Sequence, residues 1–518
     1  MKPLRLVRFF LLVFVLASFD GSAAARPTNV ASARWRDKVA PDLLREMESQ
    51  DELEFIVFLN EQADVSAAAH LVGKVQRGRY VYDVLSMTAQ RTQADILARL
   101  KDGGAEFRAY WIANMIWVRG GSALLESVAS RPEIAAVSEN PRVKFDAPVR
   151  ANEPSARAPA AVEPNIAHIR APELWALGVT GQGTVIGGQD TGYDWDHAAL
   201  RDKYRGWNGV SADHNYNWHD AIHSGGGVCG ADSGEPCDDY GHGTHTMGTM
   251  VGDDGAGNQI GVAPGARWIG CRNMDQGVGT PVTYAECFQW FVAPTDMGDE
   301  NPDPSLAPDV INNSWACPPR EGCDEAERAV METVVENVRA AGITVVSSAG
   351  NSGSNCGTVQ FPPAIYDATF SVGATGIDLT NNSDYIAGFS SRGPVTIDER
   401  NLLKPDVVAP GVNVRSSLPG TNSYGSLSGT SMAAPHVSGL VALLVSANPA
   451  LAGNVAGIEA AITGSAVPLM SDQDCGGISG SAVPNNTFGY GRIDALRAYE
   501  RIALLYKYYF PISPLAGV

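Results

Sequence analysis

Three polar residues have the types that nucleophilic catalysis requires, and each lies in a glycine-containing stretch. Asp190 is in GGQDTG, His242 is in YGHGTH and Ser431 is in GTSMAAP. A serine hydroxyl is a poor nucleophile until an imidazole accepts its proton, and the imidazole needs a carboxylate that fixes its tautomer and stabilises its charge. The three residues could therefore carry out acyl transfer. Ser431 would be the nucleophile, His242 the general base and then acid, and Asp190 the residue that orients the histidine.

A fourth polar residue could complete such a site. Asn351 is in SSAGNSG (347–353), which follows an apolar run. Its amide could donate a hydrogen bond to the oxyanion of acyl transfer, together with the backbone N–H of Ser431. Taken alone, Ser431 has a simpler interpretation, because serine is a common helix cap. We prefer the catalytic interpretation, since a cap would not require the other three stretches.

The residues around these positions predict alternating strands and helices. Strands are expected at 184–190, 267–275, 309–315, 343–351, 368–375 and 404–411, and helices near 242–251, 281–292, 324–341 and 431–446. Such alternation is typical of a parallel sheet covered on both faces, so the predicted fold class is α/β with three layers. Sites in these sheets form beyond the carboxyl ends of strands, where Asp190 and Asn351 are expected to lie.

A smaller module precedes this region, over about residues 50 to 147. Strands are expected at 53–60, 106–112, 114–120 and 134–140, and helices at 81–100 and 122–130. The order β-α-β-β-α-β is that of the split βαβ, or ferredoxin-like, fold. The fold by itself does not indicate a function.

The motifs together resemble the subtilase family of serine proteases. The matching stretches are DTG, GHGTHTMGT, GVAPGA (261–266), SSAGNSG and GTSMAAPHVSG, and the order Asp, His, Ser is that of subtilisin. The resemblance covers about residues 166 to 500. Two longer stretches, DHNYNWHDAIHS (213–224) and GCRNMDQGVGTPVTYAECFQWF (270–291), are most similar to the bacillopeptidase F-like group.

The resemblance implies further site residues. Asn351 matches the oxyanion-hole donor of the family. NNSW (312–315) matches the strand on which a peptide substrate pairs, beside the primary specificity pocket. The implied substrate-binding residues are Ser314, Trp315, Ala316, Ala349 and Gly350. Subtilases usually have glycine where this chain has Ala316, and the added methyl group affects how deep the pocket can be.

The resemblance also implies a domain organisation. Residues 26–147 resemble a subtilase propeptide, which assists folding and inhibits the enzyme until it is removed. Residues 166–504 are the expected subtilisin-like peptidase domain. The stretch 148–165 is rich in proline and alanine and predicts a linker in which the enzyme cleaves itself. Residues 505–518 are expected to be a short tail.

The first 25 residues predict a secretory signal peptide. They hold three basic side chains, an apolar core at 9–19 and an Ala-Ala-Ala cleavage site at 23–25. The alternative is a retained anchor, but the apolar core is too short to span a membrane comfortably. We therefore expect an exported protein, either extracellular or periplasmic, with no membrane association after the signal peptide is removed.

Eight cysteines all follow residue 228: Cys229, Cys237, Cys271, Cys287, Cys317, Cys323, Cys356 and Cys475. An even number in an exported protein predicts disulfides. The local pairs Cys229/Cys237 and Cys317/Cys323 are attractive, although the sequence leaves the connectivity open. Zinc is the competing interpretation, but no CxxC pair is present.

Charge and composition limit the partners. The net charge is −19, and the acidic excess lies after residue 150, which argues against nucleic acid as a ligand. No catalytic metal or cofactor is expected. Structural calcium is a further expectation of the family, with 251–259, Asp194 and Asp196 as candidate ligands. We interpret His245 as a packing residue, and His214, His219 and His223 as a solvated loop rather than a metal site.

The sequence therefore predicts a secreted serine endopeptidase, made as a zymogen and active on protein or peptide substrates. Its own propeptide would be an intramolecular inhibitor, and we expect a monomer. One alternative is a non-catalytic protein that grips peptides in a former protease cleft, but no catalytic residue is missing. The other is a processing protease with few targets, which the sequence leaves open.

Overall fold

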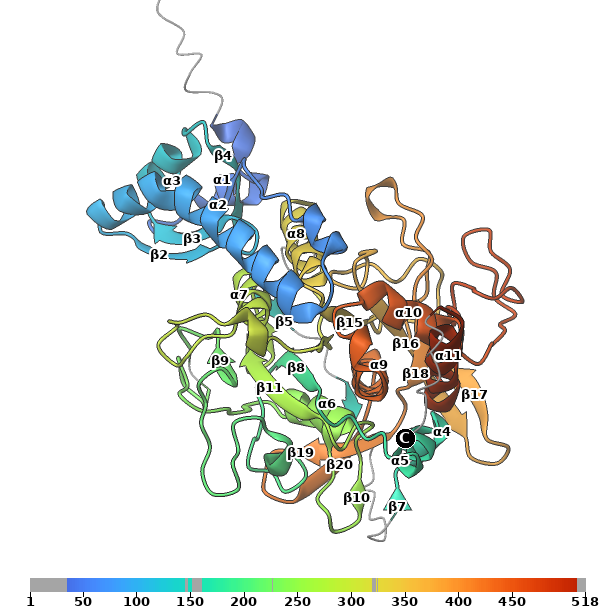
Figure 1. Ribbon diagram of the computed structural model, residues 1–518. Helices are drawn as coiled ribbons and strands as arrows, with labels where there is room; N and C mark the ends of the chain where they lie inside the picture. The colour runs from blue at the N-terminus through green and yellow to red at the C-terminus, as the bar shows by residue number, and fades with distance from the viewer. Residues whose placement is uncertain are drawn as a thin grey trace, which may run out of the picture.

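The structure is a computed structural model that describes residues 35–144, 148–150, 161–225, 227–318, 323 and 325–509. The predicted signal peptide lies outside the described residues, as do most of the predicted linker and the end of the predicted tail. Two units are distinguished below. The N-terminal unit comprises residues 35–144 and the sheet unit comprises residues 161–509 (Figure 1).

The N-terminal unit has the predicted split βαβ order. Its elements are the 3-10 helix η1 (Arg36–Lys38), α1 (Pro41–Glu46), β1 (Leu53–Leu59), the 3-10 helix η2 (Ser66–His70), α2 (Lys74–Asp102), β2 (Glu106–Tyr110), β3 (Met115–Gly120), α3 (Ser122–Ala129) and β4 (Ile134–Glu139). The four strands form an antiparallel sheet in the order β2-β3-β1-β4. Helix α2 begins at Lys74, seven residues before the predicted start at Val81. The prediction missed these residues because the stretch Lys74–Tyr80 is mostly polar and contains Gly78.

Both faces of this small sheet are apolar. Successive side chains of a strand point to opposite faces. Phe55 and Val57 of β1 pack with the unit's own helices. Ile56 and Phe58, between them, pack instead with residues of the sheet unit. The N-terminal unit therefore has a core of its own and a second apolar face that the sheet unit covers.

The sheet unit is built on one large, mainly parallel sheet. Its main strands are β8 (Val185–Asp190), β9 (Trp218–Asp220), β11 (Arg267–Arg272), β14 (Val310–Asn313), β15 (Thr344–Ser348), β16 (Phe370–Asp378), β17 (Ser383–Ile386) and β18 (Val407–Pro410). The order is β17-β16-β15-β14-β8-β11-β9, with β18 paired to β16, and only β17 is antiparallel.

Helices cover both faces of this sheet, as predicted (Figure 1). They are α4 (Pro164–His168), α5 (Ala171–Ala176), α6 (His242–Val251), α7 (Pro281–Val292), α8 (Glu325–Ala340), α9 (Thr430–Ala447), α10 (Val455–Thr463) and α11 (Ala495–Tyr509). One face carries α6 and α9 and the other carries α7 and α8. Helix α11 includes the first residues of the predicted tail.

Short elements complete the fold, and the first two, β5 and β6, precede the sheet unit. The short strands are β5 (Val143–Lys144), β6 (Val149–Arg150), β7 (Ala161–Val162), β10 (Asn258–Gln259), β12 (Met274–Asp275), β13 (Val278–Gly279), β19 (Val414–Leu418) and β20 (Ser423–Ser428). The 3-10 helices are η3 (Arg201–Lys203), η4 (Pro304–Leu306), η6 (Ile397–Glu399) and η7 (Pro449–Leu451).

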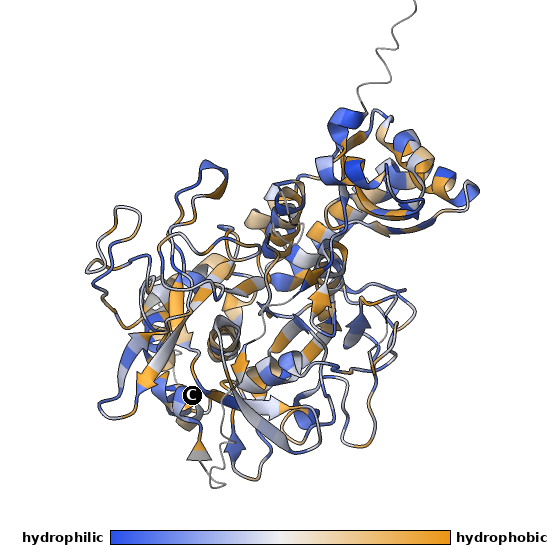
Figure 2. Cartoon of the chain, turned by 180° about the vertical axis from the view of Figure 1, so that it is seen from behind, coloured by the Kyte–Doolittle hydropathy of each residue, from blue (hydrophilic) through white to orange (hydrophobic). Residues whose placement is uncertain are grey.

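Helix α9 is apolar around its whole circumference. It is long and apolar enough to cross a membrane by length and composition, and 89% of it is buried inside the protein. The central strands and the helices beside them carry most of the hydrophobic residues (Figure 2). A helix that is apolar on all sides fits the middle of a large core, so α9 anchors its N-terminal residues to the most rigid part of the unit.

All eight cysteines form disulfides. The pairs are Cys229–Cys237, Cys271–Cys287, Cys317–Cys323 and Cys356–Cys475. The two local pairs suggested by spacing are therefore confirmed, and zinc ligation by cysteine is excluded. The pair Cys356–Cys475 joins residues 119 positions apart, so no local spacing could have indicated it.

Candidate active site

Asp190 and His242 form a buried pair at the carboxyl edge of the sheet. Asp190 is the last residue of β8, and His242 is the first residue of α6. Both are 1% exposed, and Nδ1 of His242 lies 2.7 Å from Oδ1 of Asp190. The backbone N–H of Thr191 donates to the same oxygen at 2.8 Å, and the Thr246 hydroxyl donates to Oδ2 at 3.4 Å. The carboxylate is thus held in one orientation, with an imidazole nitrogen as its closest partner.

Ser431 lies in the first turn of α9, which packs along α6. Its hydroxyl donates to the main-chain oxygen of Ser314 at 3.2 Å, and the hydroxyl of Ser314 donates back to the main-chain oxygen of Ser431 at 3.0 Å. These reciprocal bonds join the start of α9 to the end of β14. The side chain is 2% exposed, so the predicted nucleophile is recessed rather than lying on the surface.

The amide of Asn351 is oriented by the residue that precedes Ser431. The backbone N–H and the hydroxyl of Thr430 both donate to Oδ1 of Asn351 at 2.9 Å. Because its oxygen is occupied in this way, Nδ2 is the part of Asn351 that can donate to a substrate. A Cβ atom built at Gly429 would lie 3.6 Å from this Nδ2 and 3.7 Å from the backbone nitrogen of Ser431. The two predicted oxyanion donors therefore face the same small space.

A pocket of about 30 Å³ adjoins these residues. Its lining includes Ser314, Trp315, Ala316, Gly350, Asn351 and Ser431, and also Ser348, Ser352, Pro318, Phe361, Thr430 and Lys144. The second group was not predicted: Phe361 and Pro318 belong to segments without a recognisable motif, whereas Ser348, Ser352 and Thr430 lie within the quoted motifs. Ala349 was predicted to bind substrate, but it is 3% exposed and lies outside the lining.

The chain is held against this site on both sides of residues 145–147. Strand β5 pairs antiparallel with β13, and its Lys144 lines the small pocket. Strand β6 pairs antiparallel with β20, the strand that leads to Ser431. Between them, Cβ of Pro148 lies 3.4 Å from the Cβ position of Gly429. Main-chain pairing with exposed strands is one general way in which a protein binds an extended peptide.

Comparison with known proteins agrees with this geometry. Residues 181–491 match the Subtilase family, Peptidase S8. The chain belongs to the subtilase family. It is 35% identical over 498 residues to bacillopeptidase F of Bacillus subtilis (strain 168), an alignment that covers 90% of this chain and 32% of that protein. It is 31% identical over 286 residues to subtilisin E of the same organism (55% of this chain and 61% of subtilisin E).

A third relative is subtilisin DY of Bacillus licheniformis, 32% identical over 289 residues, which covers 55% of this chain and 85% of that protein. The chain spans only 32% of the length of bacillopeptidase F and 61% of the length of subtilisin E. The similarity to bacillopeptidase F extends over 90% of this chain and therefore includes most of the residues outside the subtilase match. The predicted resemblance to the bacillopeptidase F-like group is confirmed.

His245, near the Asp190–His242 pair of this subtilase, has a structural environment. His245 is buried, and its Nε2 lies 3.0 Å from the main-chain oxygen of Val414. Burial lowers the pKa of His245 to about 3, so it stays neutral. This geometry agrees with a packing role.

The histidines of the 213–224 stretch differ from the prediction. His219 and His223 are mostly buried, and the Nε2 atoms of both lie within 2.9 Å of Oε1 of Glu286 on α7. Nδ1 of His214 lies 3.0 Å from the hydroxyl oxygen of Tyr204. The prediction of a solvated loop is therefore wrong. The sequence could not indicate the pairing, because Glu286 lies more than sixty positions away from both histidines.

No metal centre accounts for these side chains. Among the residues that the structure describes, no group of three or more His, Cys, Asp or Glu is arranged to hold a metal ion. In the 251–259 stretch, Asp254 already accepts hydrogen bonds from the backbone of Ala256 and Asn258 and from the side chains of Asn258 and Tyr424. Both carboxylate oxygens of Asp254 are thus occupied within the protein, and structural calcium at the other candidates, Asp194 and Asp196, stays a prediction.

The N-terminal unit docks on α7 and α8 of the sheet unit. The Tyr110 hydroxyl donates to Oε2 of Glu286 at 2.6 Å. The backbone N–H groups of Trp111 and Ile112 donate to the side chain of Gln289. Asn337 of α8 donates to the main-chain oxygen of Ile112 at 2.6 Å. Polar side chains of α7 and α8 thus form hydrogen bonds with main-chain groups of the turn between β2 and β3. The apolar face of the small sheet packs beside them.

Proposed function

We propose that this subtilase is a serine endopeptidase that hydrolyses peptide bonds through an acyl-enzyme. The observation that carries the proposal is the buried pair of Asp190 and His242, with 2.7 Å between Nδ1 and Oδ1, beside helix α9, whose first turn holds the recessed Ser431. A carboxylate on Nδ1 leaves Nε2 as the nitrogen that accepts the proton of the nucleophile. Asn351 and the backbone of Ser431 supply the two donors that an oxyanion needs.

In the proposed reaction, Ser431 attacks the scissile carbonyl carbon. The hydroxyl first turns away from the main-chain oxygen of Ser314, and its proton passes to Nε2 of His242. The tetrahedral oxyanion accepts hydrogen bonds from Nδ2 of Asn351 and the N–H of Ser431. His242 then gives its proton to the leaving amine, and the acyl-enzyme is hydrolysed by the same steps with water as nucleophile. No cofactor takes part in the proposed reaction.

The enzyme is proposed to be made as a self-processing zymogen. Residues 1–25 would be a signal peptide and 26–147 a propeptide that inhibits the peptidase domain, 166–504. The pairing of β5 with β13 and of β6 with β20 supports this proposal, because both flanks of residues 145–147 are held against the site. The self-cleavage would then occur between Lys144 and Val149, at or just before the linker 148–165.

Secretion follows from the proposed signal peptide and agrees with the four disulfides, since disulfides persist in oxidising compartments. The proposed substrates are proteins or peptides, with the propeptide as an intramolecular inhibitor. The acidic charge argues against nucleic acid. We propose that the mature enzyme works as a monomer, without a membrane.

The test compares the masses of secreted wild type and secreted Ser431→Ala. We expect wild type to lose its chain up to a residue between 144 and 149, and the variant to keep it. A fluorophosphonate probe should label mature wild type at Ser431 alone. If both proteins are trimmed alike, the self-processing proposal is wrong. If the probe labels no residue and a peptide library stays intact, the endopeptidase proposal is wrong as well.

A further inference from the structure

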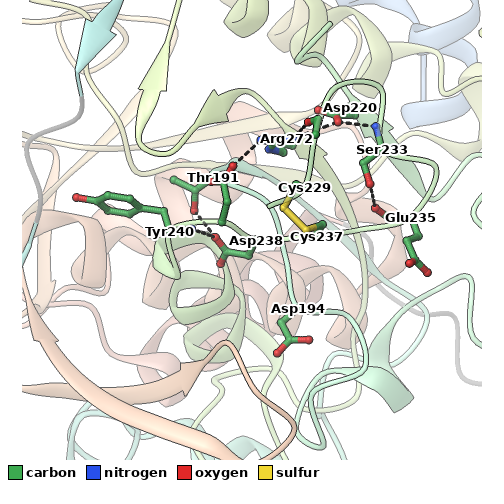
Figure 3. Close-up of a disulfide and its surroundings, with 12 residues drawn as sticks. Thr191, Asp194, Asp220, Cys229, Ser233, Glu235, Cys237, Asp238, Tyr240 and Arg272 are labelled. Carbon is green, nitrogen blue, oxygen red and sulfur yellow. Dashed lines mark hydrogen bonds and ion pairs between the residues drawn. A yellow bond between two sulfur atoms is a disulfide. The ribbon is translucent and has the colours of Figure 1, made fainter. Parts of the chain in front are cut away.

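A short disulfide-closed loop lies against the turn that follows Asp190 and leads into the start of the helix that carries His242. Cys229 and Cys237 close a loop of eight positions that leads directly into Asp238, four residues before His242 (Figure 3). The main-chain oxygen of Cys237 accepts a hydrogen bond from Tyr193 at 3.2 Å. A side chain on Gly192 would place Cβ only 1.7 Å from that oxygen. The Cys237 backbone therefore lies directly on the turn that follows Asp190.

Asp238 joins the end of β8 to the start of α6. Its Oδ1 accepts hydrogen bonds from the Thr191 hydroxyl at 2.8 Å and from the Gly241 N–H at 2.7 Å. Its Oδ2 accepts from both the N–H and the hydroxyl of Thr244, at 2.9 and 2.6 Å. Thr191 follows Asp190, whereas Gly241 and Thr244 flank His242. One carboxylate thus fixes the backbone on both sides of the catalytic hydrogen bond, and its charge suits a helix N-terminus.

Thr191 makes the connection tighter. Its N–H donates to the Asp190 carboxylate, and its hydroxyl oxygen accepts from the N–H of Gly243 at 3.0 Å. The hydroxyl proton is given to Asp238 (Figure 3). A shift of Asp238 would therefore be passed to Asp190 and His242 together.

Arg272 holds the other side of the loop. This buried guanidinium donates to the main-chain oxygen of Gly230 at 2.8 Å and pairs with Asp220 and Asp239. Gly230 follows Cys229, and Asp239 follows Asp238, so Arg272 contacts the loop near both cysteines. Arg272 is also the register partner of Asp190 in the sheet. The loop is thus fixed at its base, while its two cysteines are only half-buried.

We propose that Asp238 is a positioning residue for Asp190 and His242, and that the Cys229–Cys237 disulfide keeps it in place. Turnover then depends on the oxidised state of this disulfide. The inference rests on the proposed endopeptidase function and adds a determinant of kcat outside the catalytic residues. Asp238 touches no substrate, so its contribution is geometric, and small displacements at such sites cost about 10²-fold in rate.

The redox chemistry is ordinary thiol–disulfide exchange with a dithiol as reductant. A thiolate of the dithiol attacks one sulfur, the S–S bond breaks and a mixed disulfide forms. The second thiol of the reductant then displaces the remaining protein sulfur. Two electrons and two protons pass to the protein, which leaves thiols at Cys229 and Cys237 and a cyclic oxidised dithiol.

The first experiment compares Asp238→Asn with Asp202→Asn, an exposed control. In Asp238→Asn, the side-chain NH₂ group would face either the donors from Thr191 and Gly241 or those from Thr244, and it cannot accept their hydrogen bonds. We expect kcat to fall 10- to 100-fold with KM within twofold of wild type, and no change in the control. The downfield proton resonance of the His242–Asp190 hydrogen bond should weaken or move in Asp238→Asn only. Fluorophosphonate titration counts competent molecules and so separates slow enzyme from unfolded enzyme.

The second experiment compares Cys229→Ser/Cys237→Ser with Cys356→Ser/Cys475→Ser. We expect about a tenfold loss of kcat in the first double variant and unchanged kcat in the second. If a variant does not fold, the same loss of kcat can be measured on folded wild type that has been reduced with dithiothreitol and then alkylated. Treatment should slow wild type and the Cys356/Cys475 variant, but cause no further loss in the Cys229/Cys237 variant.

The proposal is overturned if Asp238→Asn matches Asp202→Asn in kcat and in the downfield resonance, or if removing Cys229–Cys237 leaves kcat unchanged. A wild-type protein that neither turns over peptide nor reacts with fluorophosphonate would refute the proposed function instead. The resonance would still report, in that case, whether Asp238 and the disulfide position the Asp190–His242 pair.

Discussion

Two regions of the molecule bury histidines, and they do so with opposite electrical consequences. Beside the Asp190–His242 pair, His245 and His436 are fully buried without an acidic partner among their hydrogen bonds, and burial lowers their pKa values to about 3 and about 4. Beneath the N-terminal unit, His219 and His223 are also mostly buried, yet their pKa values are raised, that of His219 to about 9.

The partners explain the difference. Main-chain oxygens face His245 and His436, so desolvation prevails and the neutral form is favoured. His219 and His223 share the carboxylate of Glu286 and have Asp299 and Asp232 at their other nitrogens. Desolvation is still the largest single effect on each, but the hydrogen bonds and charges of the acids together exceed it. Burial alone therefore does not set the charge of a histidine in this protein. The two histidines beside the Asp190–His242 pair are kept neutral, whereas the two on the docking surface are kept charged by their acidic partners.

Asp190→Asn is expected to cause the largest loss of turnover on the catalytic side of this comparison. The amide keeps the size of the side chain but loses the charge that stabilises the imidazolium, and it favours the wrong tautomer. We expect kcat to fall about 10⁴-fold on a peptide substrate. Amide exchange in β2 and β3 should match that of Ser431→Ala, which also keeps the chain intact, since the docking surface is untouched. A loss below tenfold would contradict the role given to Asp190.

Asn351→Ala tests whether the neutral donors of the catalytic side are fixed for the oxyanion. We expect kcat to fall about 10²–10³-fold, the order found in subtilisin for the corresponding asparagine, with little change in KM. Asn351→Asp keeps the acceptor for Thr430 but replaces the Nδ2 donor by an oxygen, so it should not restore turnover. The matched control is Asn355→Ala, an exposed residue of the same loop. Equal kcat values for Asn351→Ala and the control would contradict the proposed role of Asn351 as an oxyanion donor.

Tyr110→Phe tests the docking side without touching the catalytic pair. The change removes the hydroxyl that donates to Glu286 across the two units. A hydrogen bond to a charged group contributes about 1.5–3 kcal/mol, so local opening of the N-terminal unit should become roughly 10- to 150-fold more frequent. Amide exchange of β2 and β3 in a Ser431→Ala background, which keeps the chain intact, measures this effect. Tyr385→Phe, on the distant β17, should leave that exchange unchanged.

The sequence was sufficient to nominate the candidate catalytic residues and insufficient for the docking side, for a physical reason. Asp190, His242, Asn351 and Ser431 each lie in a glycine-containing stretch at the end of a predicted element, so local patterns located them. Glu286 has no such surroundings, and its partners Tyr110, His219 and His223 come from three other parts of the chain. The disulfide Cys356–Cys475 was hidden for the same reason. Contacts made only after folding leave no local pattern.

The pH dependence of stability should separate the two regions by sign. Because the pKa values of His219 and His223 are raised above the ordinary value near 6.5, their contribution is complete below pH 6.5. It is lost as pH rises through the raised pKa values, of which that of His219 is about 9. His245 and His436 have lowered pKa values, so their neutral burial costs nothing above pH 6.5 and becomes destabilising as pH falls toward about 4 and then 3. Raising pH should therefore loosen the docking surface first, and lowering it should weaken the catalytic core first.

Amide exchange of Ser431→Ala, corrected for the intrinsic effect of pH, would measure both trends in one protein. Between pH 6.5 and 9, protection should fall in β2, β3 and α7 while α6 and α9 keep theirs. Between pH 6.5 and 4, α6 and α9 should lose protection first. Replacing His219 and His223 by Gln should flatten the alkaline trend alone, since glutamine keeps a hydrogen-bond donor for Glu286 but cannot titrate. If that variant still loosens at high pH, the docking surface is held by something other than the charge on these two histidines.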